Sequence, residues 1–101
     1  MQNYYSEAVD ALFRSILLLE SEDECRAFFE DLCTIKELQD MAQRLETARL
    51  LYAGKNYQEI SKQVGISSTT ISRVSRCLNY GGGGYEKVIA RLEEREKSDE
   101  V

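Results

Sequence analysis

Apolar residues recur at intervals of three and four along the first third of the chain, which is the spacing of one face of an α-helix. The first stripe, within residues 4–20, consists of Tyr5, Ala8, Val9, Leu12, Phe13, Ile16 and Leu17. The second consists of Cys25, Phe28, Phe29 and Leu32. Ser21 precedes the second stripe as an expected N-cap, with acidic residues in the first turn after it. These patterns predict two amphipathic helices.

A third helix is expected to begin with a capping box. Thr34 and Glu37 have the spacing at which each side chain bonds to the other residue's backbone amide. The apolar positions that follow are Ile35, Leu38, Met41, Ala42, Leu45 and Tyr52. Gly54 is placed to end this helix, because glycine adopts the left-handed conformation after a helix at little cost.

Two short helices are expected next. Asn56 is placed to cap a helix over about residues 57–64, Gly65 interrupts the pattern, and Ser67 is placed to cap a helix that runs to about Leu78. The sequence "NYGGGGY" then predicts a flexible loop before a last helix, with a frayed tail "SDEV". The chain has no proline and little strand-type alternation, so the expected fold is all-α, with about six helices in one domain.

The two short helices fit a helix-turn-helix. This motif needs a small residue where its second helix approaches the first, a turn residue that tolerates positive φ, and apolar side chains that fix the crossing angle. Ser61 suits the first position and Gly65 the second. The apolar set is Ile60, Val64, Ile66, Ile71 and Val74. The alternative is an ordinary αα-hairpin, for which this agreement would be chance.

The second helix of the pair has one apolar side and one polar side. Its small hydroxyls would allow close approach to the major groove, and arginine can pair bidentately with guanine. The residues expected to contact DNA are Gln58, Lys62, Ser67, Ser68, Thr69, Thr70, Ser72, Arg73 and Arg76. The alternative interpretation is a solvated polar face, which any surface helix presents.

Charge is distributed unevenly along the 101 residues, whose formal net charge is −5. Residues 1–40 contain three basic and ten acidic side chains, whereas residues 55–80 contain four basic and one acidic. Salt screens charges beyond about 10 Å. A local basic face can therefore bind DNA within a protein that is acidic as a whole.

Catalysis and metal binding are not expected. The chain has no histidine, and Cys25, Cys33 and Cys77 are widely spaced. We interpret the three cysteines as reduced, mostly buried apolar residues without a base that could activate them. The glycines at 81–84 lack the strand and the Lys-Ser or Lys-Thr pair of a phosphate-binding loop. No apolar run could span a bilayer and no signal-peptide pattern is present, so a cytoplasmic location without membrane contact is expected.

The segment "TIKELQDMAQRLETARLLYAGKNYQEISKQVGISSTTISRVSRCLNYGGGGY" resembles the Trp repressor superfamily, and more closely its YerC/YecD-type relatives. The resemblance implies an intertwined all-helical homodimer that binds operator DNA, with the recognition helix in the major groove. A single domain over 1–101 would then comprise dimerisation helices in 1–33, a helix and the helix-turn-helix in 34–78, and a last helix in 85–97.

The resemblance also implies an effector site. Two arginines that clamp tryptophan in Trp repressor match Arg44 and Arg73, and a threonine that faces the ligand matches Thr34. Cys77 replaces a serine that contacts the ligand's amino group, which disfavours tryptophan. Two guanidinium groups suit a carboxylate or phosphate ligand. Tryptophan, another small anionic molecule and the absence of any effector all stay open.

The expected function is thus a sequence-specific DNA-binding regulator, most simply a repressor, with double-stranded DNA as partner. One alternative is a protein-interaction module that uses the same helix pair, and another is a structural homo-oligomer. A separate expectation concerns Arg49, which falls near the centre of the third apolar stripe. An ion pair with Glu46 or with another helix is expected for it.

Overall fold

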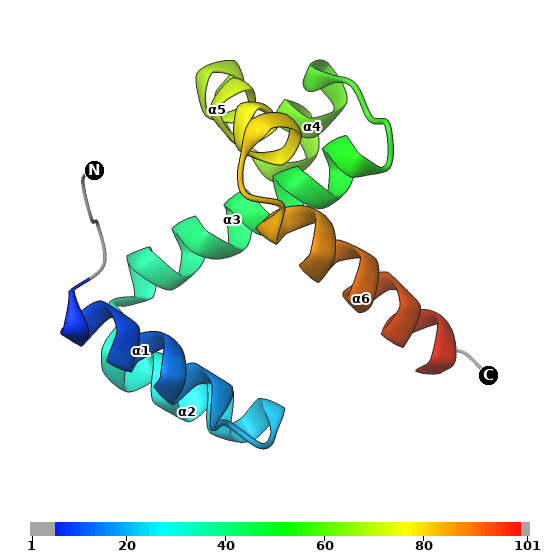
Figure 1. Ribbon diagram of the computed structural model, residues 1–101. Coiled ribbons are helices and arrows are strands. Elements are labelled where there is room, and N and C mark those ends of the chain that lie inside the picture. Colours follow the sequence, from blue (N-terminus) through cyan, green and yellow to red (C-terminus); the bar gives the residue numbers. More distant parts are fainter. Residues whose placement is uncertain (1–5, 100–101) are drawn as a thin grey trace. The chain divides into compact units, whose positions relative to one another are not determined.

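The computed structural model describes residues 6–99, so Tyr5 of the first predicted stripe lies outside the described residues. Over this range the chain forms helices and no strand (Figure 1). The helices are α1 (Glu7–Leu17), α2 (Glu22–Leu32), α3 (Ile35–Tyr52), α4 (Tyr57–Val64), α5 (Ser68–Tyr80) and α6 (Gly84–Asp99). The predicted all-α class with about six helices is confirmed.

The chain divides into two compact units, and the boundary between Leu38 and Gln39 falls within α3. The N-terminal unit contains α1, α2 and the first turn of α3. The C-terminal unit contains the rest of α3 and the three later helices. The expectation of a single domain over 1–101 stays a prediction.

Helix starts follow the local signals that the sequence carries. The Thr34 hydroxyl accepts the Glu37 amide at 3.1 Å, and the Glu37 carboxylate accepts the Thr34 amide at 2.8 Å. The predicted capping box is therefore confirmed. Hydrogen bonds with the backbone of Thr34, the larger cause, and with its side chain lower the pKa of Glu37. Asn56 and Glu59 form a second capping box. The Asn56 side chain accepts the Glu59 amide at 2.9 Å, and the Glu59 carboxylate accepts the Asn56 amide at 3.3 Å.

The serine caps are confirmed in the same way. The Ser21 hydroxyl accepts the Glu24 amide at 3.1 Å, and the Ser67 hydroxyl accepts the Thr70 amide at 3.2 Å. Ser6 caps α1, which the sequence analysis did not anticipate. Each cap satisfies one backbone amide that has no partner inside its helix.

Glycines end the helices where expected, with one surprise. Gly54 and Gly65 have φ of 90° and 81°, the left-handed region that favours glycine. Gly81 has an ordinary negative φ, yet a Cβ atom there would lie 2.3 Å from the carbonyl oxygen of Cys77. Close packing against the last turn of α5 therefore requires glycine at 81, whereas Gly82 has open space around it.

The last two helices are longer than predicted. α5 continues beyond Leu78 to Tyr80, and α6 extends over Gly84–Asp99 rather than 85–97. The flexible loop expected for "NYGGGGY" is accordingly wrong in extent, because most of that segment belongs to helices. Ser98 and Asp99 of the tail expected to fray are helical, and the remaining two residues lie outside the described range.

No side chain of the N-terminal unit is buried among its described residues, 6–38. Apolar side chains there are strongly exposed: Leu17 is 83% exposed, Leu18 76% and Ile35 76%. The amphipathic helices of this unit therefore present apolar faces that the unit itself does not cover.

The core of the C-terminal unit is small. Ala48, Val74 and Ile89 pack together from α3, α5 and α6, and Leu45, Leu51, Leu78 and Tyr85 surround them. Ile60 and Ile71 are also fully buried. The unit thus has one apolar centre that holds the helix-turn-helix against its neighbours.

The predicted apolar stripe of α3 is not what this helix buries. Ile35, Met41 and Tyr52 are exposed, whereas Thr47 and Ala48 are completely buried. The Thr47 hydroxyl finds no hydrogen-bond partner among the described residues. The residues of α3 that are buried are those that α5 and α6 cover. The apolar pattern along α3 does not reveal where these two helices pack.

Arg49 forms an ion pair with another helix, one of the two alternatives expected from the sequence. Its guanidinium lies 2.8 Å from the Glu96 carboxylate on α6, and no bond to Glu46 is found among the described residues. The pair joins α3 to the C-terminal half of α6 within the same unit. Both side chains are partly exposed, so its contribution to stability is small.

Candidate nucleic-acid interface

The helix-turn-helix is built as its sequence predicts. α4 and α5 lie against each other within the C-terminal unit (Figure 1). Ile60 and Ile71 are fully buried and Val74 is 3% exposed, whereas Val64 and Ile66 are half-buried. Ser61 does more than provide space, because its hydroxyl donates to the Ile66 carbonyl at 2.8 Å across the turn. The crossing of the two helices is therefore fixed by apolar packing and by a side-chain hydrogen bond.

Eight of the nine residues predicted to contact DNA are exposed, and the ninth, Thr70, is half-buried. The exposed residues are Gln58, Lys62, Ser67, Ser68, Thr69, Ser72, Arg73 and Arg76. The recognition helix thus shows hydroxyl and guanidinium groups to solvent on the side opposite Ile71 and Val74. A contact of these residues with DNA stays a prediction.

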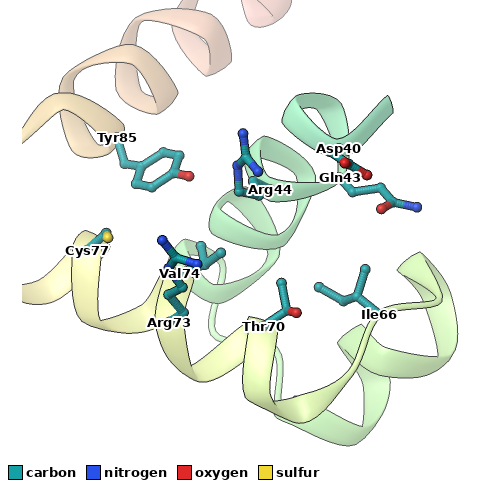
Figure 2. Close-up of a pocket in the computed structure, with 9 residues that line it drawn as sticks. All are labelled: Asp40, Gln43, Arg44, Ile66, Thr70, Arg73, Val74, Cys77 and Tyr85. Carbon is teal, nitrogen blue, oxygen red and sulfur yellow. The ribbon is translucent and has the colours of Figure 1, made fainter. Parts of the chain in front are cut away.

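A cavity of about 590 Å³ lies between α3, α5 and the start of α6. It brings Arg44 and Arg73 together from different helices, although the sequence periodicity could not place them near each other. Figure 2 shows Arg73 pointing from α5 toward α3, and the ring of Tyr85 pointing toward Arg44. The remaining lining residues are Asp40, Gln43, Ile66, Thr70, Val74 and Cys77.

Comparison with known proteins decides the family. Residues 7–93 match the family described as Trp repressor protein. The chain belongs to the Trp repressor family. It is 53% identical over 88 residues to the uncharacterized protein YerC of Bacillus subtilis (strain 168), covering 87% of this chain and 85% of that protein. The family resemblance inferred from the sequence is therefore confirmed.

Solved structures of the Trp repressor type share the fold. A candidate Trp repressor from Staphylococcus aureus superposes with a TM-score of 0.83 at 42% identity, covering 88% of this chain and 89% of that chain. A TrpR-like protein from Eubacterium eligens gives the same TM-score at 46% identity, with 87% and 91% covered. Membership of this family identifies the chain as a helix-turn-helix protein of the DNA-binding, regulatory class.

Three of the four predicted effector residues line the cavity between α3, α5 and the start of α6. Arg44, Arg73 and Cys77 contribute to its wall. Thr34 is not part of this lining, and its hydroxyl caps α3 in the N-terminal unit. Thr70, assigned from the sequence to the DNA face, turns out to line the cavity as well, where its hydroxyl lies 3.2 Å from that of Ser67.

The cysteines are free, as expected, but their predicted burial is wrong in part. Cys77 is exposed, while Cys25 and Cys33 are only half-buried. Cys77 lies on the side of α5 that lines the cavity, next in sequence to the exposed Arg76. This position leaves its side chain exposed. Among the described residues, no group of three or more acidic or cysteine side chains is arranged to hold a metal ion.

Sequence reasoning missed Tyr57, the first residue of α4. Hydrogen bonds with the hydroxyls of Ser75, the larger cause, and Ser72 lower the pKa of Tyr57. Ser75 also accepts a hydrogen bond from the Asn79 amide at 3.3 Å. A signal existed, because Ser68, Ser72 and Ser75 are spaced as one stripe of small side chains along α5. Such a stripe leaves room for a large side chain from the preceding helix.

None of the helices within residues 6–99 is sufficiently long and apolar to cross a membrane.

Proposed function

We propose that this protein is a cytoplasmic transcriptional repressor that binds specific double-stranded DNA sites by placing α5 in the major groove. The observation that supports this most strongly is a rigid helix pair, in a member of the Trp repressor family, whose exposed side carries hydroxyl and guanidinium groups. These groups form hydrogen bonds with phosphates and base edges, and arginine pairs bidentately with guanine.

Charge supports the same proposal. The segment 55–80, which contains α4 and α5, has four basic and one acidic side chain although the whole chain is acidic. Nothing among the described residues forms an ion pair with Arg73 or Arg76. Their charges are thus available to phosphates or bases, and DNA affinity should fall as salt rises.

Selection of bound sequences from random duplex DNA tests the proposed function. We expect recovery of a defined site whose affinity falls with increasing salt, with a slope of about −0.9 for each phosphate contacted. Recovery of no bound sequence, both with and without candidate effectors, would contradict sequence-specific DNA binding. It would favour the alternative of a protein-interaction module that uses the same helices.

The proposal includes a homodimer. Leu17 and Leu18 at the C-terminal end of α1 and Ile35 at the start of α3 are exposed, and a chain of 101 residues buries little apolar surface by itself. Covering such faces with a second copy removes them from water, which stabilises both chains. A two-fold dimer would read half-sites separated by about one helical turn, roughly 34 Å.

Replacing Leu17 by glutamate is expected to convert the dimer to monomer at micromolar concentration, because a charge would be placed on the apolar face. The helix should survive, since Leu17 is 83% exposed within its own unit. Sedimentation gives the mass and circular dichroism the helicity. Ala27→Glu, an equal charge change at an exposed position of α2 outside its apolar stripe, is the control and should stay dimeric. A parent chain that sediments as a monomer would contradict the dimer.

We also propose that the cavity between Arg44 and Arg73 binds a small anionic effector, such as an amino acid or a phosphate compound. Two guanidinium groups from different helices converge on it, and planar guanidinium groups bind carboxylates and phosphates bidentately. The sequence resemblance matches Cys77, which lines this cavity, to a serine of Trp repressor that contacts the ligand's amino group, and this disfavours tryptophan. A ligand held between α3 and α5 would bias the orientation of the recognition helix.

Arg44→Ala is expected to leave DNA affinity unchanged without effector and to abolish any change in affinity that a ligand causes. Arg44 lies on α3, away from the exposed side of α5, so it should act only through the ligand. DNA titrations with L-tryptophan, other L-amino acids and inorganic phosphate measure this. Arg44→Lys, which keeps the charge but loses the planar fork, should retain a weaker response. A ligand response in Arg44→Ala equal to that of the parent would contradict the site.

A further inference from the structure

Another hollow lies on the side of the helix-turn-helix that is proposed to contact DNA, separate from the cavity at Arg44 and Arg73. It has a volume of about 350 Å³ and opens between α4 and the first turn of α5. Its lining consists of Tyr57, Gln58, Ser61, Lys62 and Ser68. Three of these residues, Gln58, Lys62 and Ser68, belong to the predicted DNA face. A duplex that meets α5 would therefore also meet this hollow.

Two of the polar groups around the hollow already have partners in the protein. The Ser61 hydroxyl donates to the Ile66 carbonyl at 2.8 Å, so its proton is not available to a group in the hollow. The Tyr57 hydroxyl interacts with Ser75 and Ser72, further along α5. The Tyr57 side chain, 39% exposed, contributes to the wall of the hollow, and its hydroxyl interacts with serines of α5. The hollow thus combines one aromatic side chain with the polar side chains of Gln58, Lys62 and Ser68.

The chemistry of the major groove offers one apolar group that fits this arrangement. Base edges there present hydrogen-bond donors and acceptors, and the C5-methyl group of thymine is the apolar exception. Gln58 and Lys62 at the edge of the hollow can bond to the adjacent phosphate or base edge and so hold the duplex over it. A phosphate would be bound by Gln58 and Lys62, whereas the carbon surface of the Tyr57 ring favours an apolar group.

We infer that this hollow receives the C5-methyl group of a thymine, and that Tyr57 is a specificity-determining residue of the DNA interface. The inference rests on the proposed function, because it requires that α5 enters the major groove. It adds a contact from α4, the helix that precedes the recognition helix. It also explains a large aromatic residue at the first position of α4, which the turn itself does not require.

Replacing thymine by deoxyuridine in the selected DNA site tests the inference, since this removes one methyl group and leaves every hydrogen-bonding group in place. Each thymine of one half-site is replaced in turn. We expect one replacement to weaken binding of the parent protein about fourfold, the effect of a buried methyl group. The same replacement should have no effect on Tyr57→Ala, and the full effect on Tyr57→Phe, which keeps the ring.

Tyr52→Ala is the matched control, because Tyr52 is a tyrosine of similar exposure, 44%, at the end of α3 and outside the hollow. It should show the same loss on deoxyuridine replacement as the parent. Parent binding that is insensitive to every replacement would overturn the inference while the proposed function stands. Equal losses in Tyr57→Ala and the parent would overturn the assignment to Tyr57. A selection that recovers no duplex overturns both.

Discussion

Arg76→Ala is expected to lower affinity for the selected DNA by about 1–3 kcal/mol, or roughly 5- to 150-fold, if the guanidinium pairs with a guanine. Arg76 is exposed on α5, has no ion pair among the described residues and does not line the cavity at Arg44 and Arg73. Its loss should therefore weaken DNA binding without changing the fold or any effector response. Titration of labelled duplex against the variant measures the affinity.

The type of contact can be read from the same experiment. A base contact predicts relaxed preference at one position of the site, whereas a phosphate contact predicts uniform weakening and a salt slope that is smaller by about one. Arg91→Ala is the control, because Arg91 is an exposed arginine on α6, outside the helix-turn-helix. Parental affinity in the Arg76 variant would remove this residue from the interface. Equal weakening by both changes would indicate only a general effect of charge.

Ile71→Ala is expected to destabilise the protein by about 2–5 kcal/mol, because it leaves a cavity where the recognition helix meets the core. Ile71 is completely buried, and its neighbour Val74 belongs to the cluster that joins α3, α5 and α6. DNA affinity should fall as well, since the orientation of α5 depends on this packing. Chemical unfolding measures the free energy, at one protein concentration for all variants because the proposed dimer makes stability concentration-dependent.

A smaller truncation at the same position tests whether the loss of stability scales with the volume that is removed. Ile71→Val removes one methylene group and should cost about 0.5–1.5 kcal/mol, with DNA binding nearly intact. If alanine and valine cost the same, the site must collapse around either side chain, and α5 would not be held by Ile71. The contrast also separates loss of packing from loss of a DNA contact, because Ile71 faces away from the exposed side of the helix.

The sequence by itself determined the features that depend on neighbours within one or two turns of chain. The capping box of Thr34 and Glu37, the caps at Asn56 and Ser67, and the turn at Gly65 each involve residues three or four positions apart. Local hydrogen bonds and the conformational freedom of glycine decide these features, so the pattern is sufficient to find them. The alternation of apolar and polar positions in α5 likewise predicted correctly which side is exposed.

Only the tertiary structure decided which distant side chains meet. Arg44 and Arg73 lie on helices separated by the whole of α4, and their shared cavity depends on how α3 and α5 pack. The same is true of Arg49 with Glu96, of the burial of Thr47 in place of the predicted stripe, and of the hollow at Tyr57. Periodicity gives the direction of a side chain around its own helix axis but not the angle or offset between two helices. That geometry is set by the summed packing of the core, which brings together residues far apart in the chain.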